Sequence, residues 1–370
     1  HLRFLGTISF RDPVRPEVKD ALAKVTQAGI RTGIVTGDHR GTAEAVAQEL
    51  GMHVDRDQVI EGAELDTLSD AALQERLPIV KIISRVSPEG KVRVAKLFQE
   101  FGQVVAMTGD GLNDAASLKQ ADIGVAMGSG TAIAKDVSDL ILLDDNFSTI
   151  VAAIEEGRRI SENIRKVIVY LFASLFDELI LIGGALLAGI ALPLNALQIL
   201  FVNFIVESFH ATSFAFEDHI DYLFYGKRRF TRHLFDKEMA FLTFAIGLPS
   251  SILLFVLYAV FLRQGIDPMM AKTFIFAAFG SYSLFVIFSV RSLRKPIWAY
   301  NPFENPVLML GVFAGLGAML AAVYWPFLQN ILGTVALPLP WLAGVFAVGI
   351  ANIIAIEAGK WVLRKWRLNG

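Results

Sequence analysis

The sequence predicts two joined parts: an α/β domain with a doubly wound parallel sheet, followed by an all-α bundle of six transmembrane helices. Three observations support this prediction. Hydrophobic residues make up 54% of the 370 residues and charged residues only 19%, which is more apolar than a soluble domain of this size needs. Charges are spread through residues 1–166 and then collect in short clusters between long apolar stretches. Within residues 1–150, apolar runs alternate with helix-compatible sequence.

Short apolar runs in the first part are each followed by a polar or glycine-containing turn. Alternation of such runs with helical sequence is typical of a parallel sheet with helices on both faces. Ligands of this fold bind at the carboxyl ends of the strands. We predict strands at 31–36, 80–85, 103–107, 122–127 and 139–143.

Polar residues follow the first two predicted strands, where ligands are expected. Thr36, Gly37 and Asp38 come directly after the first apolar run, and Lys91 opens a helix after the second. A phosphoryl group needs hydrogen-bond donors on its oxygens and a cation that offsets charge in the transition state. Thr36 and the amides around Gly37 are candidate donors, and Lys91 is the candidate cation. Taken singly, these residues also fit an ordinary helix-capping turn and a solvated lysine.

A third polar segment follows the run at 103–107 and is rich in metal-binding residue types. Asp110, Asn113 and Asp114 stand within five residues of one another. Two carboxylates so close together repel each other unless a cation lies between them, and Mg²⁺ prefers oxygen ligands. We therefore predict a Mg²⁺ site in which Asp110, with Asp114 or Asn113, holds the metal directly or through water.

Six apolar stretches in the second part are long enough to cross a membrane. A helix needs about 20 residues to span roughly 30 Å of hydrocarbon. Four of the six stretches contain no charged residue, and six such stretches in series are not typical of buried soluble helices. The predicted spans are 167–190, 195–216, 239–262, 273–290, 306–328 and 339–356.

Basic residues at the ends of these spans indicate an orientation. Sixteen lie on the side that carries residues 1–150, and only Arg263 and Lys272 lie on the other. Because basic residues accumulate on the cytoplasmic side, we expect the α/β domain and the C-terminus in the cytoplasm, at the plasma membrane of a prokaryote. Residues 146–190 contain no proline, so we expect a stalk helix over 151–166 to continue into the membrane domain, residues 167–370.

Three carboxylates lie well inside the predicted spans and are candidate ligands of a transported cation. They are Asp177 and Glu178 in the first span and Glu207 in the second. A charge at mid-bilayer costs at least about 2.5–3.5 kcal/mol, so such residues usually face a partner, an ion or water. Helical spacing places Ser174 and Glu178 on one face, and Asn203 and Glu207 on another, so two helices offer oxygens to one cation. The alternative is a purely structural hydrogen-bond network.

Several motifs occur together and in order, and through them the chain resembles the P-type cation-transporting ATPases, whose phosphorylation domain is haloacid-dehalogenase-like. The resemblance covers essentially the whole chain and is greatest for the type II pumps, which include calcium, sodium/potassium and proton/potassium transporters. It implies ATP as substrate, Mg²⁺ as cofactor and an aspartyl-phosphate intermediate, with Asp12, Thr36, Gly37 and Asp38 at the nucleotide and phosphate. The matching segments are Asp12-Pro13-Val14-Arg15, Thr36-Gly37-Asp38, Val86-Ser87-Pro88-Glu89-Gly90-Lys91 and Met107-Thr108-Gly109-Asp110-Gly111-Leu112-Asn113-Asp114.

One motif of that family does not occur in these 370 residues: Asp-Lys-Thr-Gly-Thr, whose Asp accepts the phosphate. The resemblance therefore implies the C-terminal part of a pump, and we expect its missing N-terminal part as a partner. That part would supply the acceptor Asp, the nucleotide-binding and actuator domains, and the first four spans. By itself this chain is expected to be inactive.

The resemblance also bears on the transported ion. Glu178, Asn203 and Glu207 match ligand positions of the calcium pumps, with Glu207 in place of a shorter Asp. Leu175 replaces a ligand Asn, and Phe285 stands near a further acid of those pumps. We therefore expect one ion site, with Ca²⁺ as the first choice and Na⁺, K⁺, Mg²⁺ or H⁺ as alternatives.

Composition and motifs weigh against other classes of protein. The absence of Cys excludes disulfides, thiolate metal sites and a Cys nucleophile. A formal net charge of −2 argues against a nucleic-acid partner. A membrane-tethered phosphatase would need its own Asp-x-Asp at a strand end, and none precedes Thr36. A catalytically inactive regulatory or assembly subunit is the alternative that is not an enzyme.

Overall fold

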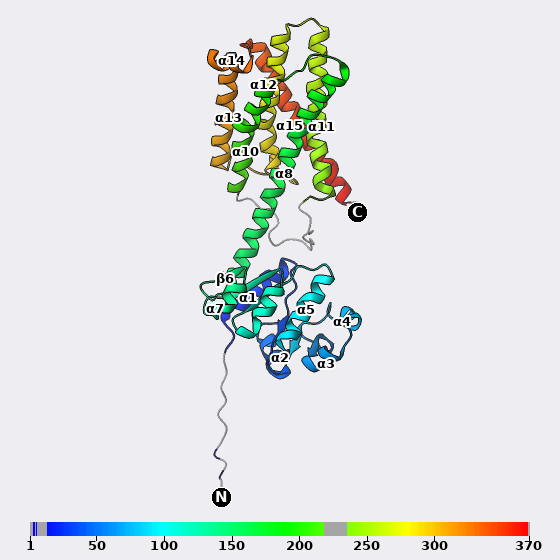
Figure 1. Ribbon diagram of the computed structural model, residues 1–370, viewed down its shortest axis with the longest axis vertical. Helices are drawn as coiled ribbons and strands as arrows, with labels where there is room; N and C mark the ends of the chain where they lie inside the picture. The colour runs from blue at the N-terminus through cyan, green and yellow to red at the C-terminus, as the bar shows by residue number, and fades with distance from the viewer. Residues whose placement is uncertain (1–2, 4, 6–12, 218–234, 369–370) are drawn as a thin grey trace. The chain divides into compact units, whose positions relative to one another are not determined.

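The computed structural model describes residues 3, 5, 13–217 and 235–368 of the chain. They form two compact units: the first takes in the chain up to Gly157, and the second begins at Arg158. The boundary lies inside one helix, α8, which runs from Ser148 to Ala188 (Figure 1). Asn146 caps this helix, because its side-chain oxygen accepts the Ser148 N–H at 2.8 Å.

The first unit is built from short strands, each followed along the chain by a helix (Figure 1). The described strands are β1 (Ile34–Val35), β2 (Val59–Glu61), β3 (Ile82–Ser84), β4 (Ala106–Gly109), β5 (Ile123–Met127) and β6 (Leu140–Leu142). The helices are α1 (Pro16–Gln27), α2 (Arg40–Glu49), α3 (Gly62–Thr67), α4 (Asp70–Arg76), α5 (Pro88–Glu100), α6 (Ala115–Gln120) and α7 (Ala132–Val137), with one-turn 3₁₀ helices η1 (Arg56–Gln58) and η2 (Leu112–Asp114).

These strands form two three-stranded parallel sheets, in the orders β1-β3-β2 and β4-β5-β6. The predicted α/β class with parallel strands is confirmed, and each of the five predicted strands overlaps an observed one. The sequence does not predict β2, because Val59 and Ile60 are its only apolar residues. β1 and β4 lie at the edges of different sheets, whereas the sequence predicts one sheet.

Helices bury the middle strand of each sheet. All three residues of β3 are buried, and Ile83 packs in one apolar cluster with Leu65 of α3, Leu73 of α4 and Val94 of α5. In β5 the buried residues are 124–126. Burial on both faces is typical of central strands in parallel sheets. Because the strands of each sheet are parallel, their carboxyl ends lie at the same edge of that sheet.

Gly124 of β5 offers a test of this packing. A Cβ at this position would lie 2.6 Å from the Leu118 carbonyl oxygen, which belongs to the backbone of α6. We expect Gly124→Ala to destabilise the first unit by about 1–3 kcal/mol, because the backbone must shift. Amide hydrogen exchange of the strands, measured in the full chain, checks this. Gly41→Ala on α2 is the control: nothing lies within 4 Å of its Cβ, so protection should be unchanged or slightly higher.

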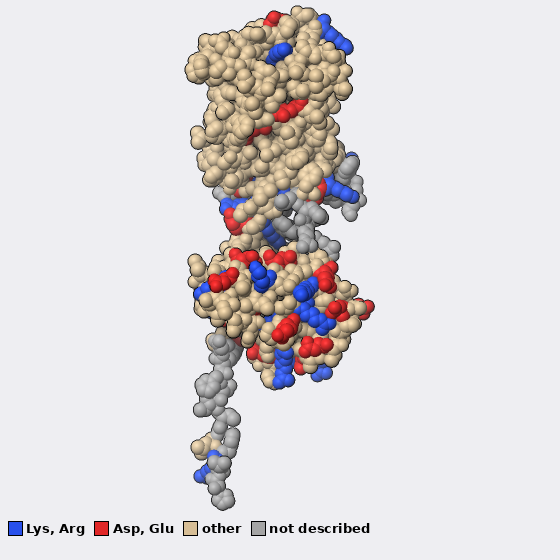
Figure 2. All heavy atoms as spheres, viewed as in Figure 1, with Lys and Arg blue, Asp and Glu red and all other residues tan. Residues whose placement is uncertain are grey.

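The second unit contains six spans, which confirms the predicted helical bundle. In the described part of the chain, six helical segments are long and apolar enough to cross a membrane. The face of this unit seen in Figure 2 carries few charged side chains. The spans are α8; the consecutive segments α9 (Ala196–Phe201), η3 (Val202–Glu207), α10 (Ser208–Ser213) and η4 (Phe214–Phe216); α11 (Lys237–Arg263); α12 (Pro268–Val290); α13 (Pro306–Tyr324); and α15 (Leu339–Leu368). Two short segments, η5 (Ile297–Ala299) and α14 (Pro326–Leu332), lie between spans.

α12 is the most enclosed helix of the bundle. In its most apolar stretch 83% of the residues are buried, compared with 28–33% in the other five spans. Phe274, Phe276 and Phe279 belong to the large apolar cluster that joins it to neighbouring helices. A helix that is apolar all round and buried all round makes contacts on every side. Side chains of α12 therefore reach the interior of the bundle.

Candidate functional site

The carboxyl ends of β1 and β3 bring Thr36 beside the start of α5. The Thr36 N–H donates to the Ile83 carbonyl at 2.9 Å, and the Val86 N–H donates to the Thr36 carbonyl at 3.1 Å. The Thr36 hydroxyl oxygen accepts the Asp38 N–H at 3.1 Å. Thr36 is half-buried, whereas Gly37 and Asp38 are exposed. The predicted phosphate-binding residues thus form an open turn whose Thr hydroxyl retains its own proton to donate.

Lys91 links the two sheets. Ser87 caps α5 by accepting the Gly90 N–H at 3.1 Å, which sets the first turn of the helix that carries Lys91. The Lys91 ammonium donates to Asp114 Oδ1 at 2.5 Å, and the side chains of Lys91 and Asp114 are only 16% and 17% exposed. The structure therefore brings together the predicted cation of one sheet and a predicted metal ligand of the other.

The predicted metal ligands differ in their surroundings. Asp110 and Asn113 are exposed, and in the described residues the Asp110 carboxylate has no hydrogen-bond partner. Asp114 is half-buried, with Oδ1 bound to Lys91 and Oδ2 accepting the Gly111 N–H at 3.4 Å. The described residues contain no group of three or more His, Asp or Glu side chains able to hold a metal. Mg²⁺ often needs only one or two carboxylates, so this donor set fits it.

A second layer of contacts holds the backbone at Asp110. The Thr131 N–H donates to the Asp110 carbonyl at 2.9 Å, and the Ser129 N–H, in the same turn, donates to Asp145 Oδ1 at 2.9 Å. Arg15 donates to the Asp145 carbonyl. Asp145 has a φ of 53°, in the left-handed region that Asp tolerates better than most residues. The Ser129 amide lowers the pKa of the Asp145 carboxyl. Asp145 thus connects the turn that contains Ser129 to the start of α8.

In the bundle, two pairs of polar side chains join α8 to the π-helical segment η3. Ser174 donates to Glu207 Oε1 at 2.5 Å, and Asn203 donates to Glu178 Oε1 at 2.7 Å. Each helix contributes residues four apart, so the pairs lie one turn apart between antiparallel helices. Asn203 Oδ1 is buried and has no partner in the described residues. π-Helical turns occur frequently at functional sites.

Asp177 has a hydrogen-bond partner on a third helix, α11. It is fully buried, and its Oδ1 accepts the Ser251 hydroxyl of α11 at 2.6 Å. Asp177 Oδ2 has no partner in the described residues. The hydrogen bond of Asp177 therefore goes to α11, whereas those of Glu178 and Glu207 join α8 and η3.

Comparisons with known proteins agree with both units. A family model described as haloacid dehalogenase-like hydrolase matches residues 2–122, and one described as cation transporting ATPase, C-terminus, matches residues 191–362. Calcium-transporting ATPase 1 of Bacillus cereus is 38% identical over 378 residues, covering 97% of this chain and 42% of the relative. The chain belongs to the type II P-type cation-transporting ATPases.

More distant relatives extend this family assignment. Calcium-transporting ATPase 1 of Yarrowia lipolytica is 35% identical, over 100% of this chain and 40% of its own length. Calcium-transporting ATPase type 2C member 1 of Homo sapiens is 34% identical, over 96% of the chain and 39% of its own length. The chain thus spans about two fifths of these curated relatives. The resemblance drawn from the motifs is confirmed, and the chain is a multi-pass membrane protein.

Sequence reasoning misses two residues that the structure places beside predicted site residues. Ser283 of α12 donates to Glu207 Oε1 at 2.7 Å. The predicted span that contains Ser283 has no charged residue, so nothing in the sequence marks it as part of a polar site. Arg85 follows β3, and its guanidinium lies 2.8 Å from the His39 ring beside Asp38. A basic residue at the end of a predicted strand is the signal that points to Arg85. Asp12 lies outside the described residues.

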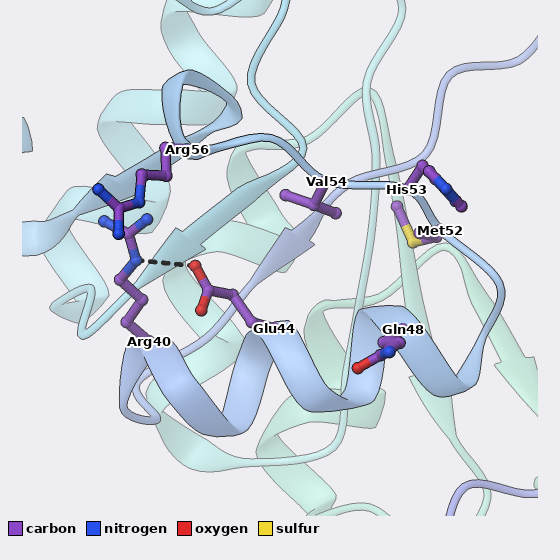
Figure 3. A pocket seen from close by; sticks show the side chains of 7 residues that line it. All are labelled: Arg40, Glu44, Gln48, Met52, His53, Val54 and Arg56. Carbon is purple, nitrogen blue, oxygen red and sulfur yellow. Dashed lines mark hydrogen bonds and ion pairs between the residues drawn. The ribbon is translucent and has the colours of Figure 1, made fainter.

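A pocket in the first unit is lined by none of the predicted phosphate-binding or metal-binding residues. It has a volume of about 670 Å³ and forms between α2 and residues 52–56. Figure 3 shows an ion pair inside it, Arg40 Nε to Glu44 Oε1 at 2.8 Å. Its lining residues are Arg40, Glu44, Gln48, Met52, His53, Val54 and Arg56.

The lowered pKa of the Asp145 carboxyl predicts a pH dependence of the turn that contains Ser129. The ordinary Asp pKa is about 3.9, so the Ser129 contact stabilises the turn above that pH and is lost as the pH falls through the lower, folded-state pKa. We expect the exchange protection of the Ser129 amide to fall below about pH 4. Asp145→Asn should remove this pH dependence. Asp144→Asn is the control, since the Asp144 carboxylate binds Asn146 and Thr149 instead, and a loss in that variant contradicts the assignment.

Proposed function

We propose that this chain is the C-terminal part of a pump that moves a cation, with Ca²⁺ as first choice, across a membrane by way of an aspartyl-phosphate intermediate formed from ATP. The observation that carries the proposal is the set of oxygen ligands between α8 and η3, with a buried Asn203 oxygen left unpartnered. A buried acceptor without a partner is rare, and a bound cation satisfies it. Sodium, potassium, magnesium and protons remain alternative cargoes.

The phosphoryl chemistry is assigned to the strand ends of the first unit. Thr36 and the amides near Gly37 donate to phosphoryl oxygens, and Lys91 offsets their negative charge. Asp110 and Asp114 would hold Mg²⁺, which supplies further positive charge when bound. Asn113 is exposed on the same turn and orients water or the metal. Lys91 also fixes Asp114, so one cation serves both the phosphate and the metal ligand.

The phosphate acceptor is assigned to a strand outside these 370 residues. The residues of β1 are only half-buried, and Ala106 and Thr108 of β4 are exposed, in contrast to fully buried β3. Strands of parallel sheets are normally covered and paired on both sides. We propose that a strand carrying the acceptor Asp inserts between β1 and β4. That insertion would join the two sheets into the single sheet that the sequence predicts.

Coupling between the two chemistries is assigned to α8. Asp145 accepts the Ser129 N–H, and Thr131, two residues further on, donates to the Asp110 carbonyl. α8 begins three residues after Asp145, at Ser148, and the same helix carries Glu178. A change at the strand ends therefore reaches the cation ligands through a single helix. We propose a cytoplasmic first unit and C-terminus at a prokaryotic plasma membrane, from the sixteen-to-two distribution of basic residues and the likeness to the Bacillus pump.

Asp110 tests the phosphoryl assignment. In the complete pump, Asp110→Asn should slow phosphorylation from ATP by at least about a hundredfold, because loss of a metal carboxylate costs several kcal/mol of transition-state stabilisation. The measurement is the rate of labelled phosphoenzyme formation at saturating Mg²⁺. Asp20→Asn, an exposed residue of α1, is the control and should leave the rate unchanged. Near-normal phosphorylation of the Asp110 variant rejects it as a principal ligand.

Glu178 and Glu207 test the cation site. Gln keeps the size and one carbonyl oxygen but loses the charge that balances a cation, so Glu178→Gln and Glu207→Gln should each weaken cation activation of ATP hydrolysis about tenfold or more. Phosphorylation from inorganic phosphate should survive in the same samples, since the strand ends are unchanged. A structural network instead predicts poor folding of both variants. Unchanged cation affinity in well-folded protein refutes the site.

A further inference from the structure

Glu207 is held by hydroxyl groups from two different helices. Ser174 of α8 and Ser283 of α12 both donate to the same oxygen, Oε1, at 2.5 and 2.7 Å. All three side chains are buried, with Ser283 fully enclosed and Glu207 only 4% exposed. Hydrogen bonds to a charged acceptor are about twice as strong as neutral ones. The orientation of this carboxylate is therefore set by its neighbours rather than by its own rotamer preference.

Ser283 behaves differently from other hydroxyl residues of the spans. Thr273 and Thr212 donate to the carbonyl four residues earlier in their own helix, at 2.8 Å, and Ser251 does so at 2.7 Å in addition to binding Asp177. Ser and Thr hydroxyls in helices commonly make this hydrogen bond to the carbonyl of the preceding turn. The Ser283 hydroxyl instead donates to Glu207 and lies beside the Tyr170 hydroxyl of α8. Its hydroxyl is committed to another helix.

The length of the acid explains how this contact arises. Glu207 stands where the calcium pumps that this chain resembles have Asp, and it is one methylene longer. The extra length lets the carboxylate reach α12, which contributes no acid of its own and has Phe285 two residues after Ser283. Because α12 is the most enclosed span, its hydroxyl is a rigid support. Both hydroxyls bind Oε1, so Oε2 is left for another ligand.

We propose that Ser283 is a positioning residue of the cation site: with Ser174 it fixes Oε1 of Glu207 and thereby presents Oε2 to the transported cation. This inference rests on the proposed function and extends it to a third helix. α12 then sets the affinity of the site through a hydroxyl rather than through a carboxylate.

The test compares serine variants in the complete pump, with Ca²⁺ as the probe. Ser283→Ala should weaken the apparent Ca²⁺ affinity about tenfold, by loss of one hydrogen bond to a charged group, while phosphorylation from inorganic phosphate stays normal. Ser283→Thr, which keeps the hydroxyl, should restore most of the affinity. Ser289→Ala is the matched control: Ser289 is equally buried on α12 and its hydroxyl has no partner in the described residues, so affinity should not change.

A double-mutant cycle tests the contact itself. Glu207→Asp shortens the acid, so the effect of Ser283→Ala in that background should nearly vanish. Equal loss of affinity in Ser283→Ala and Ser289→Ala, or full affinity in a well-folded Ser283→Ala pump, overturns the proposal. If Glu207→Gln weakens Ca²⁺ affinity and Ser283→Ala does not, only the role of Ser283 fails. If Glu207→Gln has no effect, the proposed cation site fails as a whole.

Discussion

The need to satisfy every carboxylate inside hydrocarbon organises the membrane unit. No water is available there to hydrate a charge, so an acid must find hydroxyl, amide or cation partners. Glu207 has Ser174 and Ser283, Glu178 has Asn203, and Asp177 has Ser251. Each partner lies on a different helix from its acid. The hydrogen bonds that keep the acids in the membrane are therefore also the bonds that fix which helices are neighbours.

Small residues let these neighbouring helices approach closely enough to form the hydrogen bonds. A Cβ at Gly247 of α11 would lie 2.8 Å from the Ala173 carbonyl oxygen of α8, so only glycine allows this approach. Ser251, one turn along α11, is then within reach of Asp177. Close backbone approach at small residues is the usual basis of helix association in membranes. Packing and polar contacts thus depend on each other along α8.

Local rules recover most of the architecture and part of the sites. Apolar runs and their turns locate five strands, but β2 has too few apolar residues to stand out from its surroundings. Helical spacing places Ser174 and Glu178 on one face of α8, but it does not predict their partners across the interface, which are Glu207 for Ser174 and Asn203 for Glu178. Ser283 is 76 residues from Glu207, and no periodicity within a span reports such a contact. Pairing between helices is set by tertiary packing, which a single helix does not encode.

The open edges of β1 and β4 bear on how this chain behaves when it is produced alone. An unpaired strand edge presents a row of N–H and C=O groups that accepts a strand from any source. Edge strands of the first unit, β1 and β4 among them, favour pairing between copies of the chain. Aggregation of the isolated chain would therefore start in its water-exposed α/β unit, and a detergent chosen to protect the apolar bundle would not prevent it. A short strand-forming peptide that occupies these edges is the more direct stabiliser.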